Sequence, residues 1–271
     1  MNKTFDIKRL GLVMRWDFQS YWAYYLGAAI GNIIAFSLYS LIRLYHVNPM
    51  NGDAASIKEL YIGRETFYFM ATIIISFYVM ASCIFTNLTA KTSRESFLMI
   101  PANNTEKFMA RFLQMLICDL LLLAFVLIGT DIIQLAFSYI ITPDFHISIS
   151  LPVLKSITND FLLTPFSKEE CIVISLLIFM HSFATLGGTF YRKMAPLLTF
   201  VTGLVLLMVL GYAINWLGKA GLLHFNLSLT NSYIATMVTC AFFLALSLFN
   251  YWASYKIFTR MQVICNKWIN I

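Results

Sequence analysis

Two aspartates and one histidine are the residues whose types and positions could do chemistry in an apolar environment. Asp119 and Asp131 fall in a long apolar run that also holds Arg111, and His181 lies near the middle of another run. An ionisable side chain inside a membrane is costly, so it needs a partner on a neighbouring helix or subunit, or it contacts a substrate or a proton. We predict Asp119 and His181 as a candidate substrate path, with a purely structural hydrogen bond as the alternative for each.

Depth distinguishes the two aspartates. If a helix starts at Asn104, Asp119 lies about 22 Å along it and Asp131 about 40 Å along it, close to the outer interface. Asp119 is therefore the stronger candidate. We expect Asp119→Leu to change transport or dimer stability more than Asp131→Leu.

Several familiar kinds of site are missing from the sequence. It contains no GxxxxGK[ST], HExxH or GxSxG motif, so it predicts no nucleotide-phosphate loop, zinc protease site or nucleophile elbow. His46, His146 and His224 are scattered singly, and the five cysteines form no CxxC pair. We therefore predict neither a metal site nor a disulfide framework, and no cofactor held by this chain.

The elements that must position these residues are membrane helices. Of the 271 residues, 59% are hydrophobic and only 12% are charged, about half the charged fraction of a soluble domain. The basic residues stand at the ends of apolar runs and form no stripe with aromatics, which excludes a nucleic-acid partner. Apolar runs long enough to cross the lipid core occupy residues 22–42, 67–88, 108–141, 171–190, 195–217 and 230–253.

The fold class that follows is all-α: an integral membrane protein with six transmembrane helices, forming a single domain over residues 1–271. Residues 1–21 repeat apolar side chains on one helical face beside basic ones, which predicts an N-terminal amphipathic helix in the membrane interface. With both termini cytoplasmic, thirteen of the nineteen Lys and Arg residues lie inside, so this orientation satisfies the positive-inside rule.

Local motifs add detail to these helices. Ser167 and Glu170 form a predicted capping box before the fourth span, and Asn103 and Glu106 do the same before the third. Gly27 and Gly31 form a GxxxG pair, which predicts close approach of another helix. The adjacent pair at 187–188 is predicted to loosen the end of its helix instead.

The connection between the second and third spans is the most specific segment. Residues 89–107 combine a charged start with the apolar patch at 97–100 and a proline break, which predicts an amphipathic element at the cytoplasmic surface. Lys91, Arg94, "LMIPA" at 98–102, "EKF" at 106–108 and Arg111 follow one another here. This pattern resembles the permease subunits of bacterial type-2 ATP-binding-cassette (ABC) transporters.

The resemblance implies a permease half in the cell inner membrane that pairs with a second copy or a homologous half. It also implies that residues 89–107 form a coupling loop on a separate cytoplasmic ABC ATPase, which would hold ATP and magnesium. The docking residues expected from this reading are Lys91, Arg94, Glu95, Phe97, Leu98, Met99, Ile100, Pro101, Glu106, Lys107 and Arg111. Lipid headgroups are the alternative partner for the same apolar patch.

Three functions remain open from the sequence. The favoured one is the permease of an ATP-driven exporter, which is not itself an enzyme. The second is an intramembrane enzyme that uses Asp119 or His181, and the third is a membrane assembly or sensory subunit that transports nothing.

Overall fold

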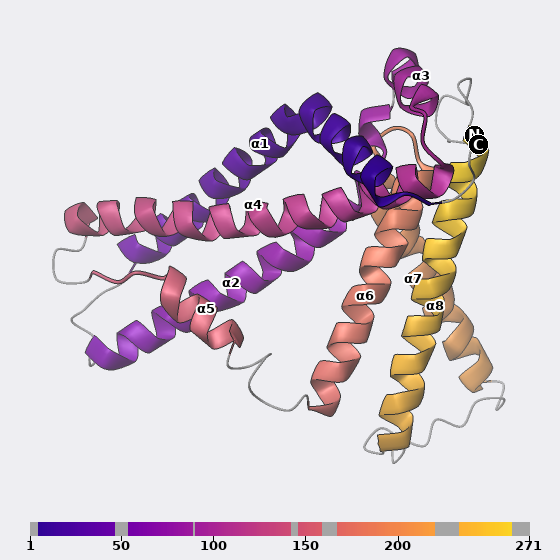
Figure 1. Ribbon diagram of the computed structural model, residues 1–271. Coiled ribbons are helices and arrows are strands. Elements are labelled where there is room, and N and C mark those ends of the chain that lie inside the picture. Colours follow the sequence, from indigo (N-terminus) through magenta and orange to yellow (C-terminus); the bar gives the residue numbers. More distant parts are fainter. Residues whose placement is uncertain are drawn as a thin grey trace. The chain divides into compact units, whose positions relative to one another are not determined.

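The computed structural model describes residues 5–46, 54–88, 90–141, 146–158, 167–219 and 233–261, which are almost entirely helical (Figure 1). Six of the described helices are long and apolar enough to cross a membrane. They are α1 (Ile7–Tyr45), α2 (Ala54–Ser82), α4 (Asn104–Ile141), α6 (Lys168–Phe190), α7 (Ala195–Lys219) and α8 (Tyr233–Arg260). The predicted fold class, an all-α multi-pass membrane protein, is confirmed.

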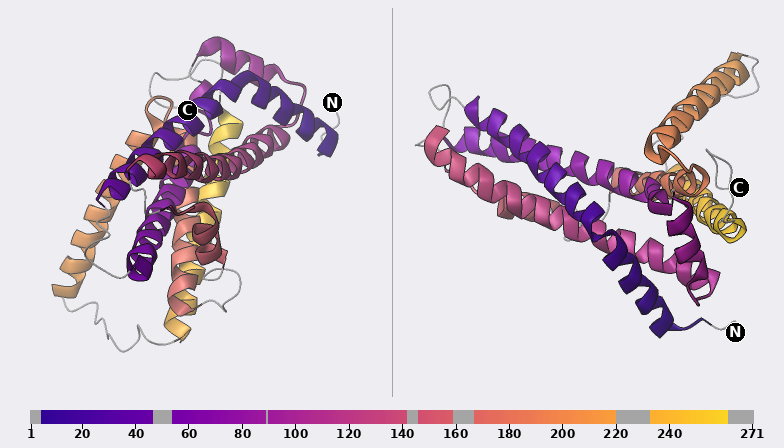
Figure 2. Two further views of the ribbon diagram at one scale, coloured as in Figure 1. Left: turned by 90° about the vertical axis from the view of Figure 1, so that its left-hand side faces the viewer. Right: turned by 90° about the horizontal axis from the view of Figure 1, so that it is seen from above.

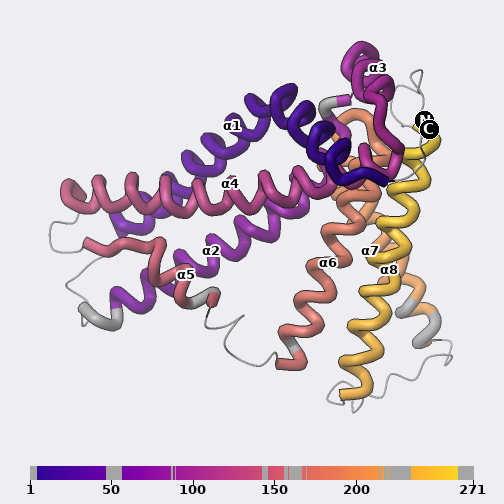
Figure 3. The backbone as a smooth tube through the Cα atoms, viewed as in Figure 1, coloured from indigo at the N-terminus to yellow at the C-terminus, as the bar shows by residue number. Residues whose placement is uncertain are grey.

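The helix limits differ from the predicted spans at several places; α2 begins at Ala54, before the predicted residue 67, and α8 ends at Arg260, after the predicted residue 253. The predicted interfacial helix and the first span are one uninterrupted helix, because the sequence of α1 contains no proline. The second span was expected to reach residue 88, but α2 ends at Ser82 and a 3₁₀ turn, η2 (Thr86–Leu88), follows. Figure 3 traces the backbone through both segments.

Two short helices stand in the connections. The helix α3 (Lys91–Met99) occupies the predicted coupling loop, and α5 (Ser150–Thr158) lies between the third and fourth predicted spans. At the start of α6, the Ser167 hydroxyl accepts from the amide of Glu170, and the Glu170 carboxylate accepts from the amide of Ser167. The predicted capping box is therefore confirmed.

The contacts divide the chain into two compact units, each considered by itself. Unit 1 comprises residues 1–14, 77–112 and 166–271, and unit 2 comprises residues 15–76 and 113–165. In unit 2, α1, α2 and α4 share one apolar core that includes Phe36, Tyr61 and Val126, and residues of α5 and of the segment just before it join this core. Figure 2 shows the backbone of these helices in two further views.

Unit 1 is organised around α6 and α8, which pack along each other (Figure 1). The Asn250 amide of α8 donates to the Ser182 hydroxyl of α6 at 3.1 Å, and both side chains are buried. Such interhelical hydrogen bonds stabilise helix pairs in membranes, where apolar contacts alone do not favour one helix neighbour over lipid.

Candidate functional site

The helix α3 has a buried inner face and an exposed outer face. Arg94 and Phe97 are buried, with 1% and 0% of their surface exposed. Lys91, Glu95 and Met99 follow one another at intervals of one helical turn and are exposed or half-buried, and Met99 is 81% exposed. We call these three residues the outer face of α3.

Arg94 fastens α3 to the turn that precedes it. Its Nε donates a hydrogen bond to the carbonyl oxygen of Leu88 at 3.2 Å, and Leu88 ends η2. A buried guanidinium needs such acceptors, because leaving its N–H groups without partners would cost free energy. Arg94 therefore holds α3 in place from its inner face.

Phe97 fastens the same face to the start of α4. The Arg111 guanidinium lies 4.3 Å from the centroid of the Phe97 ring, within the range of a cation–π interaction. Arg111 also donates from Nη1 to the carbonyl oxygen of Ile84 at 3.1 Å. On its other side, Phe97 meets the ring of Phe258 in α8, with centroids 6.2 Å apart. One aromatic side chain thus joins α3 to two membrane helices.

Two further residues of the first turn of α4 complete the attachment. Lys107 Nζ donates to the carbonyl oxygen of Leu98 at 2.7 Å. Glu106, fully buried, accepts from the amide of Asn103 at 2.8 Å, as the predicted cap requires. The Lys107 side chain therefore holds the C-terminal end of α3 to the N-terminal end of α4, and Glu106 caps α4.

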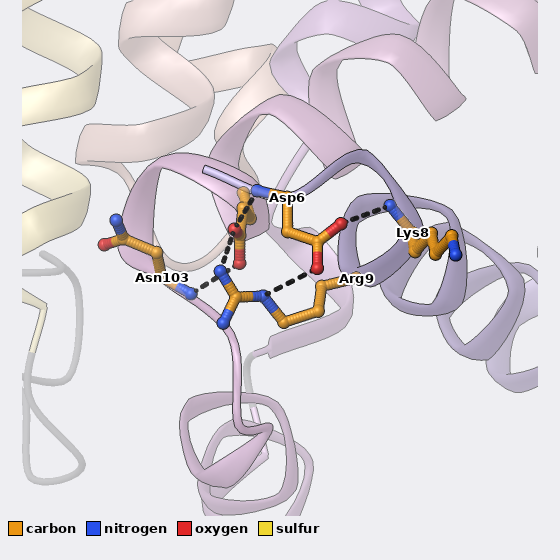
Figure 4. A network of polar contacts seen from close by, with 5 residues as sticks. Asp6, Lys8, Arg9 and Asn103 are labelled. Carbon is orange, nitrogen blue, oxygen red and sulfur yellow. Dashed lines mark hydrogen bonds and ion pairs between the residues drawn. The ribbon is translucent and has the colours of Figure 1, made fainter. Parts of the chain in front are cut away.

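Glu106 also holds the start of the described chain. Figure 4 shows Asp6, Arg9 and Asn103 of this network from close by. Oε1 of Glu106 accepts from the amide of Asp6 at 2.8 Å and from Arg9 Nη2 at 2.9 Å. The carboxylate thus ties residues about a hundred positions apart in the sequence. We call Asp6, Arg9, Asn103 and Glu106 the N-terminal clamp.

This geometry divides the docking residues expected from the sequence. Those that are exposed or half-buried are Lys91, Glu95, Leu98, Met99, Ile100 and Pro101. Those that are buried are Arg94, Phe97, Glu106, Lys107 and Arg111. The docking role of both groups stays a prediction, and the side chains of the buried group pack within this chain. We assign Arg94, Phe97, Lys107 and Arg111 to the anchoring of α3 and Glu106 to the N-terminal clamp.

His181, predicted for the substrate path, lies within unit 1 between α6 and α8. Its Nδ1 and the Tyr251 hydroxyl are 2.7 Å apart and share a hydrogen bond. The rings of Phe77 and Phe112 meet the imidazole edge to face, with centroids about 6 Å away. These contacts fit the structural alternative, an interhelical hydrogen bond shielded by aromatic rings.

Asp119, the other predicted path residue, is buried within unit 2. Its side chain is 1% exposed, and its Oδ1 accepts a hydrogen bond from the Ser76 hydroxyl of α2. Its Oδ2 has no hydrogen-bond partner among the described residues. The predicted partner on a neighbouring helix is therefore present for one carboxylate oxygen of Asp119 only. Asp119 remains the candidate for contact with a polar substrate.

Asp131 has more hydrogen-bond donors than Asp119. Its carboxylate accepts from the Ser148 hydroxyl at 2.7 Å, the Ile149 amide at 2.7 Å and the Ser150 hydroxyl at 2.6 Å. Ile149 and Val153 on either side of the start of α5 are buried in the core of unit 2. Asp131 thus fastens α5 to α4, which is a structural role.

We expect Asp131→Asn to lower the free energy of unfolding by about 1–2 kcal/mol, because the amide cannot accept all three hydrogen bonds. Asp119→Asn keeps an acceptor for Ser76, so we expect a loss below about 1 kcal/mol. Thermal unfolding of both purified variants in detergent measures the difference. A larger loss for Asp119→Asn than for Asp131→Asn would contradict these roles.

The remaining predicted residues lie as follows. A Cβ atom added at Gly27 or Gly31 would meet no described atom within 4 Å, so the GxxxG pair packs against no described helix of this chain. His146 stacks on Tyr139 and shares a hydrogen bond with Ser138, while His224 and Cys265 lie outside the described residues. Over the described ranges, no three His, Cys, Asp or Glu side chains gather as metal ligands would.

Sequence reasoning missed one buried acid, Glu65, which it placed in the first outer loop. The structure has Glu65 inside α2 with none of its surface exposed. The signal was present, because Tyr61, Glu65 and Phe69 recur at the four-residue spacing of one helix face.

Comparison with known proteins found no match: no family model, no curated protein and no solved structure matches this chain.

Proposed function

We propose that this chain is the membrane-spanning permease subunit of an ATP-driven ABC exporter, and that a separate cytoplasmic subunit is the ATPase. The observation that carries the proposal is the construction of α3. A nine-residue helix between two membrane helices is anchored on one face and exposed on the other. ATP and Mg²⁺ would bind to the partner, since this sequence lacks a phosphate-binding loop.

The anchoring gives α3 a mechanical connection to the membrane helices. A force applied to the outer face would pass through Arg94 to the end of η2 and through Phe97 and Arg111 to α4. Lys107 makes a second connection to α4 through its hydrogen bond to Leu98. A coupling element needs such fixed contacts, because a loosely attached loop would absorb the movement of its partner.

The proposal includes an orientation and a stoichiometry. Both termini and α3 face the cytoplasm of a bacterial cell, and the chain resides in the inner membrane, as its distribution of basic residues favours. A second copy or homologous half completes the permease. Asp119 is the proposed contact for a polar group of the substrate.

The outer face of α3 provides the test. A double variant, Lys91→Glu with Met99→Asp, keeps all the residues that anchor α3. It replaces a positive charge with a negative one at Lys91 and an apolar side chain with a charged one at Met99. The tagged chain is purified from its native membranes, and copurifying proteins with a GxxxxGK[ST] motif are quantified by mass spectrometry together with their ATP hydrolysis. We expect the yield of ATPase to fall about tenfold or more, which corresponds to a loss of at least about 1.4 kcal/mol in binding.

The matched control is a double variant of α5, Leu151→Asp with Lys155→Glu. It makes the same chemical changes on exposed residues of another nine-residue helix. We expect this control to retain the ATPase at wild-type yield. Copurification of no nucleotide-binding protein with the wild-type chain would favour the assembly or sensory alternative, and an unchanged yield with the α3 variant would refute docking there.

A further inference from the structure

Glu65 occupies an unusual environment in unit 2. Its side chain is completely buried in α2, and its Oε2 accepts a hydrogen bond from the Ser40 hydroxyl of α1 at 2.8 Å. Its Oε1 is also buried, and no described residue donates a hydrogen bond to it. The carboxyl group thus has one satisfied oxygen and one that lacks a donor.

The packing of three helices creates this environment. Glu65 stands one turn from Tyr61 and one turn from Phe69, and both belong to the apolar core of unit 2. Ser40 stands in the same way between Phe36 and Leu44, which belong to the same core. The carboxyl group is therefore on the buried face of its helix, opposite a buried hydroxyl of the neighbouring helix.

No Lys, Arg or His side chain among the described residues forms an ion pair with Glu65. The charged and titratable groups that face it are Arg43 and Tyr39 of α1, which interact with it only electrostatically, and Tyr61 of its own helix. From α4, the nearby group is the uncharged amide of Gln134, beside Tyr61.

An ionised carboxylate in such surroundings would keep its charge without a counter-ion and with a single hydrogen bond. The free-energy cost of burying a charge in this way is large, and buried acids avoid it by remaining neutral. In the neutral acid, Oε2 accepts the hydrogen bond from Ser40 and Oε1 carries the proton.

We propose that Glu65 is an intramembrane proton-binding site that holds its proton in the folded protein at neutral pH. Release of this proton to water would leave an unpaired negative charge in the core shared by α1, α2 and α4. The protonation state of Glu65 is therefore coupled to the packing of these helices. This inference is independent of the proposed transport function.

Infrared difference spectroscopy tests the site directly. Spectra of the wild-type protein and of Glu65→Gln are recorded in lipid bilayers at neutral pH and subtracted. We expect the difference to contain the carbonyl stretching band of a protonated carboxylic acid and no carboxylate band. The control is Glu59→Gln, which changes an exposed glutamate of the same helix and should give carboxylate bands.

Thermal unfolding in detergent over a range of pH supplies a second readout. An acid that keeps its proton when folded and loses it when unfolded makes the native state less stable as the pH rises. Wild-type stability should therefore fall with rising pH more than that of Glu65→Gln. The glutamine side chain has the shape of the neutral acid, so the variant should also fold at wild-type yield.

Three results would overturn the proposal. One is a carboxylate band for Glu65 at neutral pH. Another is failure of Glu65→Gln to insert and fold. The third is that sodium chloride stabilises the wild-type protein, whereas potassium chloride does not, and that sodium chloride does not stabilise Glu65→Gln. The site would then hold a sodium ion in place of a proton.

Discussion

Replacement of Glu106 by alanine is expected to lower the free energy of unfolding by about 3 kcal/mol. The carboxylate accepts from the amides of Asp6 and Asn103 and pairs with Arg9, and none of its surface is exposed. Its removal leaves two backbone donors and one guanidinium without this acceptor. Hydrogen bonds to a charged acceptor contribute more than the average hydrogen bond, and this carboxylate accepts three of them.

Equilibrium unfolding of the purified variant in detergent measures this loss. The matched control is Glu95→Ala, which also removes a glutamate from an ion pair. Glu95 lies 3.8 Å from Lys91 on the outer face of α3, where both side chains are more than one-third exposed. We expect this control to lose less than about 1 kcal/mol, because water screens the pair. Equal losses for both variants would show that the N-terminal clamp contributes little.

Replacement of Gly188 by alanine is expected to cost about 2–3 kcal/mol. A Cβ atom at this position of α6 would lie 2.5 Å from the carbonyl oxygen of Ser82 and 2.9 Å from that of Ala81. These atoms belong to the backbone at the end of α2 and cannot move aside as a flexible side chain would. The methyl group must therefore push the two helices apart.

The control for Gly188 is Gly211→Ala in α7, where an added Cβ would meet no described atom within 4 Å. Alanine favours the helix over glycine by up to about 1 kcal/mol, so this variant should be as stable as the wild type or slightly more stable. The melting temperatures of the two variants are measured by thermal unfolding in the same detergent and compared with that of the wild type. A wild-type melting temperature for Gly188→Ala would mean that α6 and α2 do not approach so closely.

The two glycine pairs illustrate what a sequence can and cannot specify in a membrane protein. The GxxxG spacing at Gly27 and Gly31 predicts close approach of another helix, and a Cβ atom added at either position would meet no atom of another described helix within 4 Å. The adjacent glycines 187 and 188, predicted to loosen the end of their helix, are packed tightly. Gly188 faces the backbone of α2, and a Cβ at Gly187 would overlap Thr199 of α7. Spacing identifies a face where helices can approach, but the approach depends on which helix lies there.

The inner and outer faces of α3 likewise depend on which segments lie beside the helix. Residues 89–107 were correctly predicted to contain an amphipathic segment, and the helix at Lys91–Met99 has one buried and one exposed face. The sequence did not indicate that Arg94 belongs to the buried face. An arginine in a short polar segment is typical of a solvated surface, and only the carbonyl oxygen of Leu88 beside it explains its burial.

By itself, the sequence determined the class of the protein, its six apolar helices and the cap of α6, because these depend on local composition and on the hydrogen bonds of neighbouring residues. The tertiary structure decided the burial of Glu65, the anchoring of α3 and the attachment of the N-terminus to Glu106. Lipid tails are as apolar as leucine, so in a membrane helix the apolar pattern does not mark the face that packs against protein. That face, and with it the surroundings of each polar side chain, is set by contacts between segments far apart in the chain.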